Sequence, residues 1–136
     1  VKARLRLCEL SSLLREREAA IAYCTAVTER APNWADGWYQ LGREYFLQGN
    51  FEAAQMNLHQ CSTLQVMQDI PVEDRRLECW YLQGQAAEIR GDCPALLATY
   101  NEFRAMTLNS DITQTWTYPP EGPPGCTSTS NENGGS

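Results

Sequence analysis

The chain has 136 residues, of which 43% are hydrophobic, so it is long enough for one small domain with a modest core. Seventeen acidic residues against eleven basic ones give a formal net charge of −6, which argues against nucleic acid and anionic membrane surfaces as main partners. No apolar stretch approaches the roughly 20 residues of a membrane-spanning helix, so no membrane-spanning segment is predicted.

Two helices are predicted in residues 1–34. Basic and acidic residues are interspersed along the beginning of this segment, which favours a solvated helical face over a phosphate-binding patch. The first helix also carries a series of leucines, and nothing before them covers the outer ones: Leu5, Leu7, Leu10, Leu13 and Leu14. The second helix carries small and apolar residues and ends before Pro32: Ala20, Ile21, Tyr23, Cys24 and Val27.

A second pair of helices is predicted in residues 35–68. Trp38, Leu41 and Tyr45 stand at i, i+3 and i+7, so they share one helical face. A turn is predicted at Gly49, and Asn50 is a suitable N-cap for the helix that follows. Two small residues would let the two helices pack closely. They are Gly42 and Ala54.

This helix-turn-helix pattern resembles the tetratricopeptide repeat family, whose repeat is about 34 residues long. At that period the chain divides into repeats of about 1–34, 35–68 and 77–110. The third repeat restates the pattern with Trp80, Gly84, Ala87, Gly91, Leu96, Tyr100 and Phe103. Gln83 stands at the usual leucine site, and Asp92 is the expected N-cap of the last helix. The resemblance implies an all-α fold, a solenoid of three repeats with about six helices.

Eight extra residues lie between Met67 and Arg76, before the third repeat. Asp69 and Pro71 have the character of an N-cap and an early helical proline, so a longer first helix of the third repeat is predicted to start near Pro71. Tolerated growth of a connection is favoured over the alternative, a protrusion specific to a partner.

Six cysteines in so short a chain favour a disulfide framework and an oxidising, extracytoplasmic compartment. Cys8 and Cys24 lie at similar distances on either side of the first turn, and Cys61 and Cys79 flank the next connection between helices in the same way. The predicted pairs are Cys8–Cys24, Cys61–Cys79 and Cys93–Cys126. The alternative is a set of buried free thiols, for which a cytoplasmic location stays open.

Residues 111–136 are predicted to form an extended, non-helical tail rich in Pro, Thr and Ser, with a flexible or O-glycosylated end. Its aromatic residues Trp116 and Tyr118 have two possible roles. They either fold back over the last helix or clasp a neighbouring subunit.

The resemblance also implies a concave groove lined by the first helix of each repeat. Transferred position by position, its lining here is Leu5, Glu9, Tyr39, Arg43, Phe46, Tyr81, Gln85 and Glu88. The aromatic residues beside Arg43 suit an extended partner segment. Packing against adjacent helices explains Phe46 equally well.

Repeat units bury their faces only by stacking, so uncovered ends favour association between copies. The main prediction is a non-enzymatic structural subunit that stacks head to tail into a filament, tube or ring. The alternative is an adaptor that binds an extended segment of a different protein in its groove. In both cases the partners are other protein chains.

No catalytic residue, metal site or cofactor is predicted. His59, the single histidine, is expected on the polar side of its helix, with no acid at catalytic or metal-binding spacing. The cysteines form no CxxC pair, and the chain has no glycine-rich phosphate loop.

Overall fold

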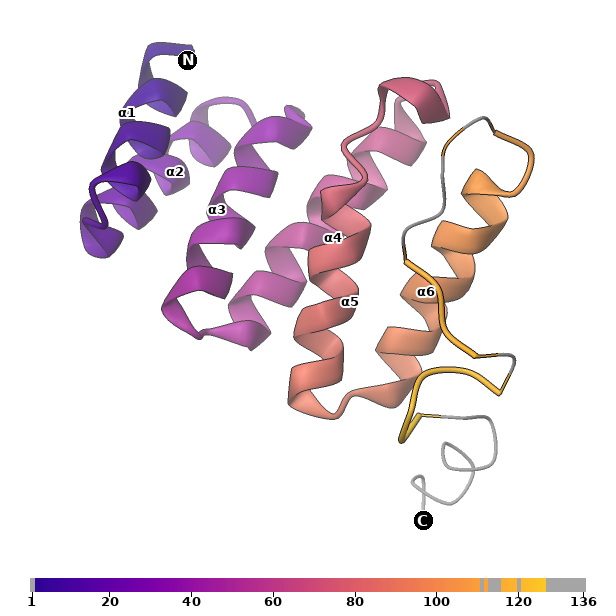
Figure 1. Cartoon of the computed structure of the whole chain (residues 1–136). Helices are drawn as coiled ribbons and strands as arrows, with labels where there is room; N and C mark the ends of the chain where they lie inside the picture. The colour runs from indigo at the N-terminus through magenta and orange to yellow at the C-terminus, as the bar shows by residue number, and fades with distance from the viewer. Residues whose placement is uncertain (1, 111, 113–115, 120, 127–136) are drawn as a thin grey trace.

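The computed structural model describes residues 2–110, 112, 116–119 and 121–126. Within these residues the protein has six α-helices, one short 3₁₀ helix and no strand. The elements are α1 (Lys2–Leu13), α2 (Arg17–Arg30), α3 (Ala35–Gln48), α4 (Phe51–Met67), η1 (Val72–Asp74), α5 (Glu78–Arg90) and α6 (Cys93–Thr107). They follow one another in hairpin pairs from α1 at one end to α6 at the other (Figure 1). The predicted all-α, six-helix fold is confirmed.

The turns inside the second and third helix pairs use the predicted capping residues. Gly49 and Gly91 end α3 and α5 with φ angles of 88° and 72°, a left-handed backbone that glycine adopts without steric cost. Asn50 and Asp92 then cap the next helices, each accepting a hydrogen bond of 3.2 Å from the backbone N–H three residues later. The turn after α1 has no glycine, and Arg15 takes the left-handed position there with φ 61°.

The core is divided unequally along the chain. A large apolar cluster joins α3 to α6 and the tail, and its largest fully buried side chains are Trp80, Phe103, Leu58 and Leu96. A second cluster holds only Cys8, Cys24 and Leu41, with Ile21 and Tyr45 packed against it. The first helix pair therefore depends on more than hydrophobic burial for its attachment.

Part of that attachment is a buried ion pair between α2 and α3. The Glu44 side chain is fully buried, and its Oε1 lies 3.0 Å from the Arg17 guanidinium. Arg43 lies 3.6 Å from Oε2, which accepts no hydrogen bond in the described residues. Both arginines donate to the Ser12 hydroxyl at the end of α1, at 3.2 and 3.1 Å. These contacts connect the first three helices.

All six cysteines lie in the described part of the chain, and none is free. The three predicted disulfides are confirmed: Cys8–Cys24 joins α1 to α2, Cys61–Cys79 joins α4 to α5, and Cys93–Cys126 joins α6 to the tail. Their Cα–Cα distances of 5.1, 5.9 and 5.3 Å lie in the usual range for the bond. The alternative of buried free thiols is therefore wrong.

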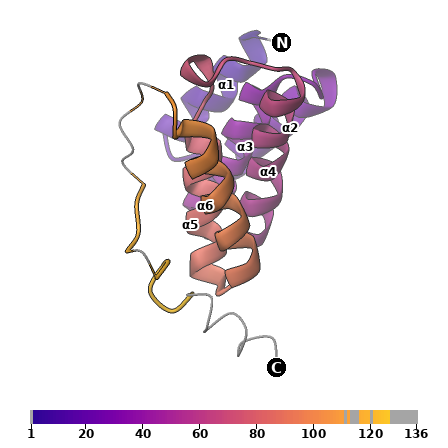
Figure 2. The same ribbon diagram turned by 90° about the vertical axis from the view of Figure 1, so that its right-hand side faces the viewer.

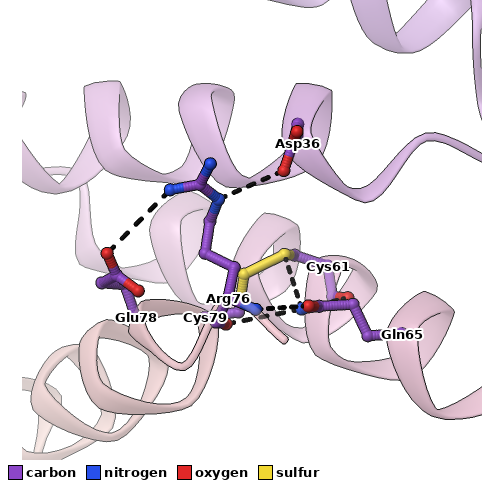
Figure 3. A network of polar contacts seen from close by, with 6 residues as sticks. All are labelled: Asp36, Cys61, Gln65, Arg76, Glu78 and Cys79. Atoms are coloured by element: carbon purple, nitrogen blue, oxygen red, sulfur yellow. Dashed lines mark hydrogen bonds and ion pairs between the residues drawn. A yellow bond between two sulfur atoms is a disulfide. The ribbon is translucent and has the colours of Figure 1, made fainter. Parts of the chain in front are cut away.

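The prediction that a helix starts near Pro71 is wrong. Pro71 has an extended backbone, a single 3₁₀ turn follows it, and α5 begins only at Glu78. The buried Gln65 explains the difference, because its amide side chain accepts from the Arg76 N–H at 2.6 Å and donates to the Arg76 carbonyl at 3.4 Å (Figure 3). Bound in this way, the backbone of Arg76 belongs to a loop anchored on α4.

The same loop is also held by the side chain of Arg76. Its Nε donates to Asp36 at 3.1 Å, and its guanidinium lies 4.5 Å from the ring centre of Tyr39 (the ion pair is drawn in Figure 3). The connection between α4 and α5, which contains the eight extra residues, is therefore packed and contacts α3 through Arg76.

Candidate interaction surfaces

A group of exposed leucines lies on the outer face of α1 and in the turn after it. Four leucines on α1 and in the turn after it are between 43% and 79% exposed: Leu7, Leu10, Leu13 and Leu14. Leu7 and Leu10 are spaced i and i+3 on α1, so they are neighbours on one face of the helix. A hollow of about 350 Å³ on the same face is lined by Ala3, Arg6, Leu7, Glu9, Leu10 and Leu13. We call this surface the leucine face. A group of exposed leucines of this kind is a candidate site of association.

Charge is distributed unevenly between this end and the rest of the chain. Residues 1–34 contain six basic and four acidic residues, a net charge of +2. The remaining residues contain five basic and thirteen acidic residues, a net charge of −8. Lys2, Arg4 and Arg6 have no ion pair within the described residues, so positive charge beside the leucine face is uncompensated.

A cleft of about 400 Å³ opens between α4 and α6, with α5 beneath it. Its apolar lining comes from Met56 of α4 and from Ala95 and Ala98 of α6, and its rim carries the exposed acids Glu52 and Glu102. The remaining lining residues are Gln55, His59, Gln83, Arg90 and Thr99. We call it the α4–α6 cleft. Its volume falls within the roughly 300 to 1,000 Å³ of ligand-binding pockets.

A satisfied polar network supports the cleft. Gln83 is buried where the repeat pattern has leucine, and its Oε1 accepts from Ser62 at 3.1 Å. Its Nε2 lies 3.2 Å from both Thr99 Oγ1 and His59 Nδ1. His59 is exposed, as predicted. Its hydrogen bond with Gln83 was not predicted. Because each polar end of Gln83 has a partner, the network fixes α4, α5 and α6 relative to one another.

On the opposite side of α6 from α4, the tail covers the last helix pair (Figure 2). Trp116 is 8% exposed, and its ring lies 5.2 Å from Tyr100, 5.3 Å from Phe103 and 5.7 Å from Tyr81. A Cβ atom at Gly84 would collide with the indole, so glycine there makes room for it. Trp116 and Tyr118 thus fold back on their own α5 and α6. The predicted end of the tail, residues 127–136, lies outside the described residues.

Tyr118 completes this contact and gives it a dependence on pH. Its N–H donates to the Tyr100 hydroxyl at 2.9 Å, and its own hydroxyl donates to both Glu88 oxygens at 3.3 Å. Burial raises the pKa of Tyr118 above 10.0; the negative charge of Glu88 acts in the same direction, and a hydrogen bond with Trp116 acts against it. The folded protein therefore keeps this proton at a pH where the unfolded chain has lost it.

The stabilisation from Tyr118 is complete below the unfolded pKa of about 10 and is lost as the pH rises through the higher folded value. We expect Tyr118→Phe to flatten the alkaline decline in unfolding free energy, measured by urea denaturation between about pH 8 and pH 11. Tyr23→Phe, at a residue that is 39% exposed, is the matched control. An unchanged alkaline slope in Tyr118→Phe would contradict the assignment.

The residues predicted to line a concave groove lie on α1, α3 and α5 and differ in exposure. Tyr39 is 8% exposed and lies beneath Arg76, while the tail packs on Tyr81 and binds Glu88. Phe46 packs edge-on against Phe51 at 5.2 Å. The others are half-buried or exposed on α1, α3 and α5: Leu5, Glu9, Arg43 and Gln85.

The leucines of the first helix were predictable from the sequence, but the α4–α6 cleft was not. The one signal for the cleft was Gln83, a polar residue at a position where the repeat pattern has leucine. Within the described residues no helix has the length and apolarity needed to cross a bilayer, and no cluster of three or more acidic, histidine or cysteine side chains has the arrangement of a metal site.

Comparison of the chain with models of protein families gives no match, and comparison with curated proteins gives none either. The tetratricopeptide resemblance therefore stays a prediction made from the sequence pattern. The helical-repeat arrangement itself stands on the six helices and their hairpin pairing.

Proposed function

We propose that this protein is a non-enzymatic, self-associating structural subunit of the tetratricopeptide type, and that copies stack head to tail through the leucine face. The observation that carries the proposal is the exposure of Leu7, Leu10, Leu13 and Leu14 on one helix end. Complete burial of such side chains is favourable by about 1.5 to 3 kcal/mol each. A surface that covers them therefore gains binding free energy.

The charge distribution supports a contact between unlike ends. Two α1 helices brought together would place their unpaired basic residues near one another, whereas α1 against the acidic remainder of another copy brings opposite charges together. A contact between two different surfaces propagates from copy to copy instead of closing as a two-fold dimer. The three disulfides support an oxidising compartment outside the cytoplasm as the place of assembly.

An adaptor that binds a foreign segment in the concave groove has less support. Two residues of its α5 part, Tyr81 and Glu88, contact the chain's own Trp116 and Tyr118, and Tyr39 is buried beneath Arg76. A foreign segment would first have to displace a tail that a disulfide holds at Cys126.

The test is the size of the purified protein as a function of concentration, measured by sedimentation velocity. We expect assemblies that grow with concentration and are lost in the double variant Leu10→Glu/Leu13→Glu, because charged side chains on the leucine face oppose burial. Leu47→Glu, at an exposed leucine of α3, is the matched control and should assemble normally. A wild-type protein that stays monomeric at all concentrations would refute the proposal.

A further inference from the structure

We infer that the α4–α6 cleft is the surface that receives the leucine face of a second copy. This rests on the proposed function, because it names the acceptor site for the same contact. The donor is an amphipathic helix with apolar side chains at helical spacing, and the acceptor is an apolar hollow between two helices, which is the arrangement of helix-in-groove recognition.

The two surfaces match in apolar character. The cleft offers Met56, Ala95 and Ala98, of which Met56 is 66% exposed, so a large apolar side chain stands open to water on the acceptor as well. Methionine adapts its shape to an incoming side chain, and the alanines leave space for it. A hollow of about 400 Å³ accommodates protruding leucine side chains rather than a whole helix.

They also match in charge. Glu102 accepts a hydrogen bond of 2.6 Å from the Trp80 indole but has no ion pair within the described residues. Glu52 is 71% exposed and only 4.0 Å from Arg90, a weak pairing. The basic residues beside the leucine face, Lys2, Arg4 and Arg6, likewise have no ion pair there. Docking therefore brings these cations near the unpaired Glu102 and the weakly paired Glu52, although Arg90 also lines the cleft.

The position of the cleft allows the contact to propagate. The cleft is lined by residues of α4, α5 and α6, whereas α1 lies at the other end of the helix array (Figure 1). No residue of the described part of the tail is among its lining residues. A copy whose leucine face is docked in a neighbour still has its own cleft open. The contact is heterologous and builds an open chain or a ring.

Two variants that each block one surface test this inference. The donor-blocked variant is Leu10→Glu/Leu13→Glu. The acceptor-blocked variant is Ala98→Arg, which places a bulky cation at an exposed position in the cleft; Asn101→Arg, exposed on α6 and outside the lining, is its control. Far-ultraviolet circular dichroism and the thermal midpoint establish that each variant is folded.

Each blocked variant alone should be monomeric, with its self-association weakened by about a hundredfold or more. Mixed in equal amounts they should form a 1:1 complex that grows no further, because one intact leucine face meets one intact cleft. Sedimentation velocity of the three samples measures this, and added salt should weaken the 1:1 complex.

The outcomes separate this inference from the proposed function. If Ala98→Arg assembles like the wild type while the donor-blocked variant does not, the leucine face docks elsewhere and the inference is wrong, although self-association stands. If the two monomeric variants form no complex when mixed, the inference is also wrong. If the wild-type protein is itself monomeric, the proposed function is refuted, and the inference that rests on it is refuted as well.

Discussion

Replacing Arg17 with Met is expected to lower the free energy of unfolding by about 3 to 5 kcal/mol, because it leaves a buried carboxylate without its close partner. The Glu44 side chain is fully buried, and Arg17 is the cation at 3.0 Å, whereas Arg43 is 3.6 Å from the other oxygen. The small apolar cluster of the first helix pair cannot compensate. Urea denaturation, followed by the helical circular dichroism signal, measures the loss.

Two further variants control this result. The double variant Arg17→Met/Glu44→Leu removes the buried charge together with its partner and should recover most of the loss, since an apolar pair replaces an ionic one. Arg30→Met, at an exposed position of the same helix, should change little. A double variant as unstable as Arg17→Met would show that the arginine acts by packing and not by compensating Glu44.

Replacing Trp116 with Ala is expected to destabilise the protein by about 3 kcal/mol, because it empties the space between the aromatic rings of α5 and α6. Tyr81, Tyr100 and Phe103 would each lose a ring contact, and Gly84 would face a void. Thermal unfolding and the near-ultraviolet circular dichroism signal, which reports on packed aromatic rings, measure the change.

Thr117→Ala is the control for this prediction, because Thr117 is exposed and adjacent in the tail. The Cys93–Cys126 bond keeps the tail tethered in both variants, so a difference between them reports the indole and not the detachment of the chain end. Equal stability of the two variants would mean that Trp116 contributes nothing to the core.

Local features of the fold were readable from the sequence because short-range physics decides them. Asn50 and Asp92 cap helices through bonds that span three residues, and glycines supply the left-handed turns. The disulfide pairs followed from the hairpin geometry of antiparallel helices and from elimination of the last pair.

Features that depend on single long-range side chains were not readable. The connection after α4 contains residues typical of a helix start. The side chain of Gln65 nevertheless binds the backbone N–H and carbonyl of Arg76, and the segment forms a loop. Gly84 matched the repeat pattern as a small residue for close helix packing. Its neighbour is the indole of Trp116, whereas the equivalent Gly42 faces Leu58 of the next helix.

The placement of the three disulfides determines how the protein responds to mechanical tension. Each closes a loop, with sequence separations of 16, 18 and 33 residues, so about half of the 136-residue chain cannot lengthen while the bonds are intact. The longest stretch between two loops is residues 25–60, which contains all of α3. A force applied to the two ends is therefore transmitted through α3, because no disulfide bridges this helix. The ion pair of Glu44 lies in the contact between the first helix pair and α3. While the bonds are intact, such a force can extend only the residues outside the three loops.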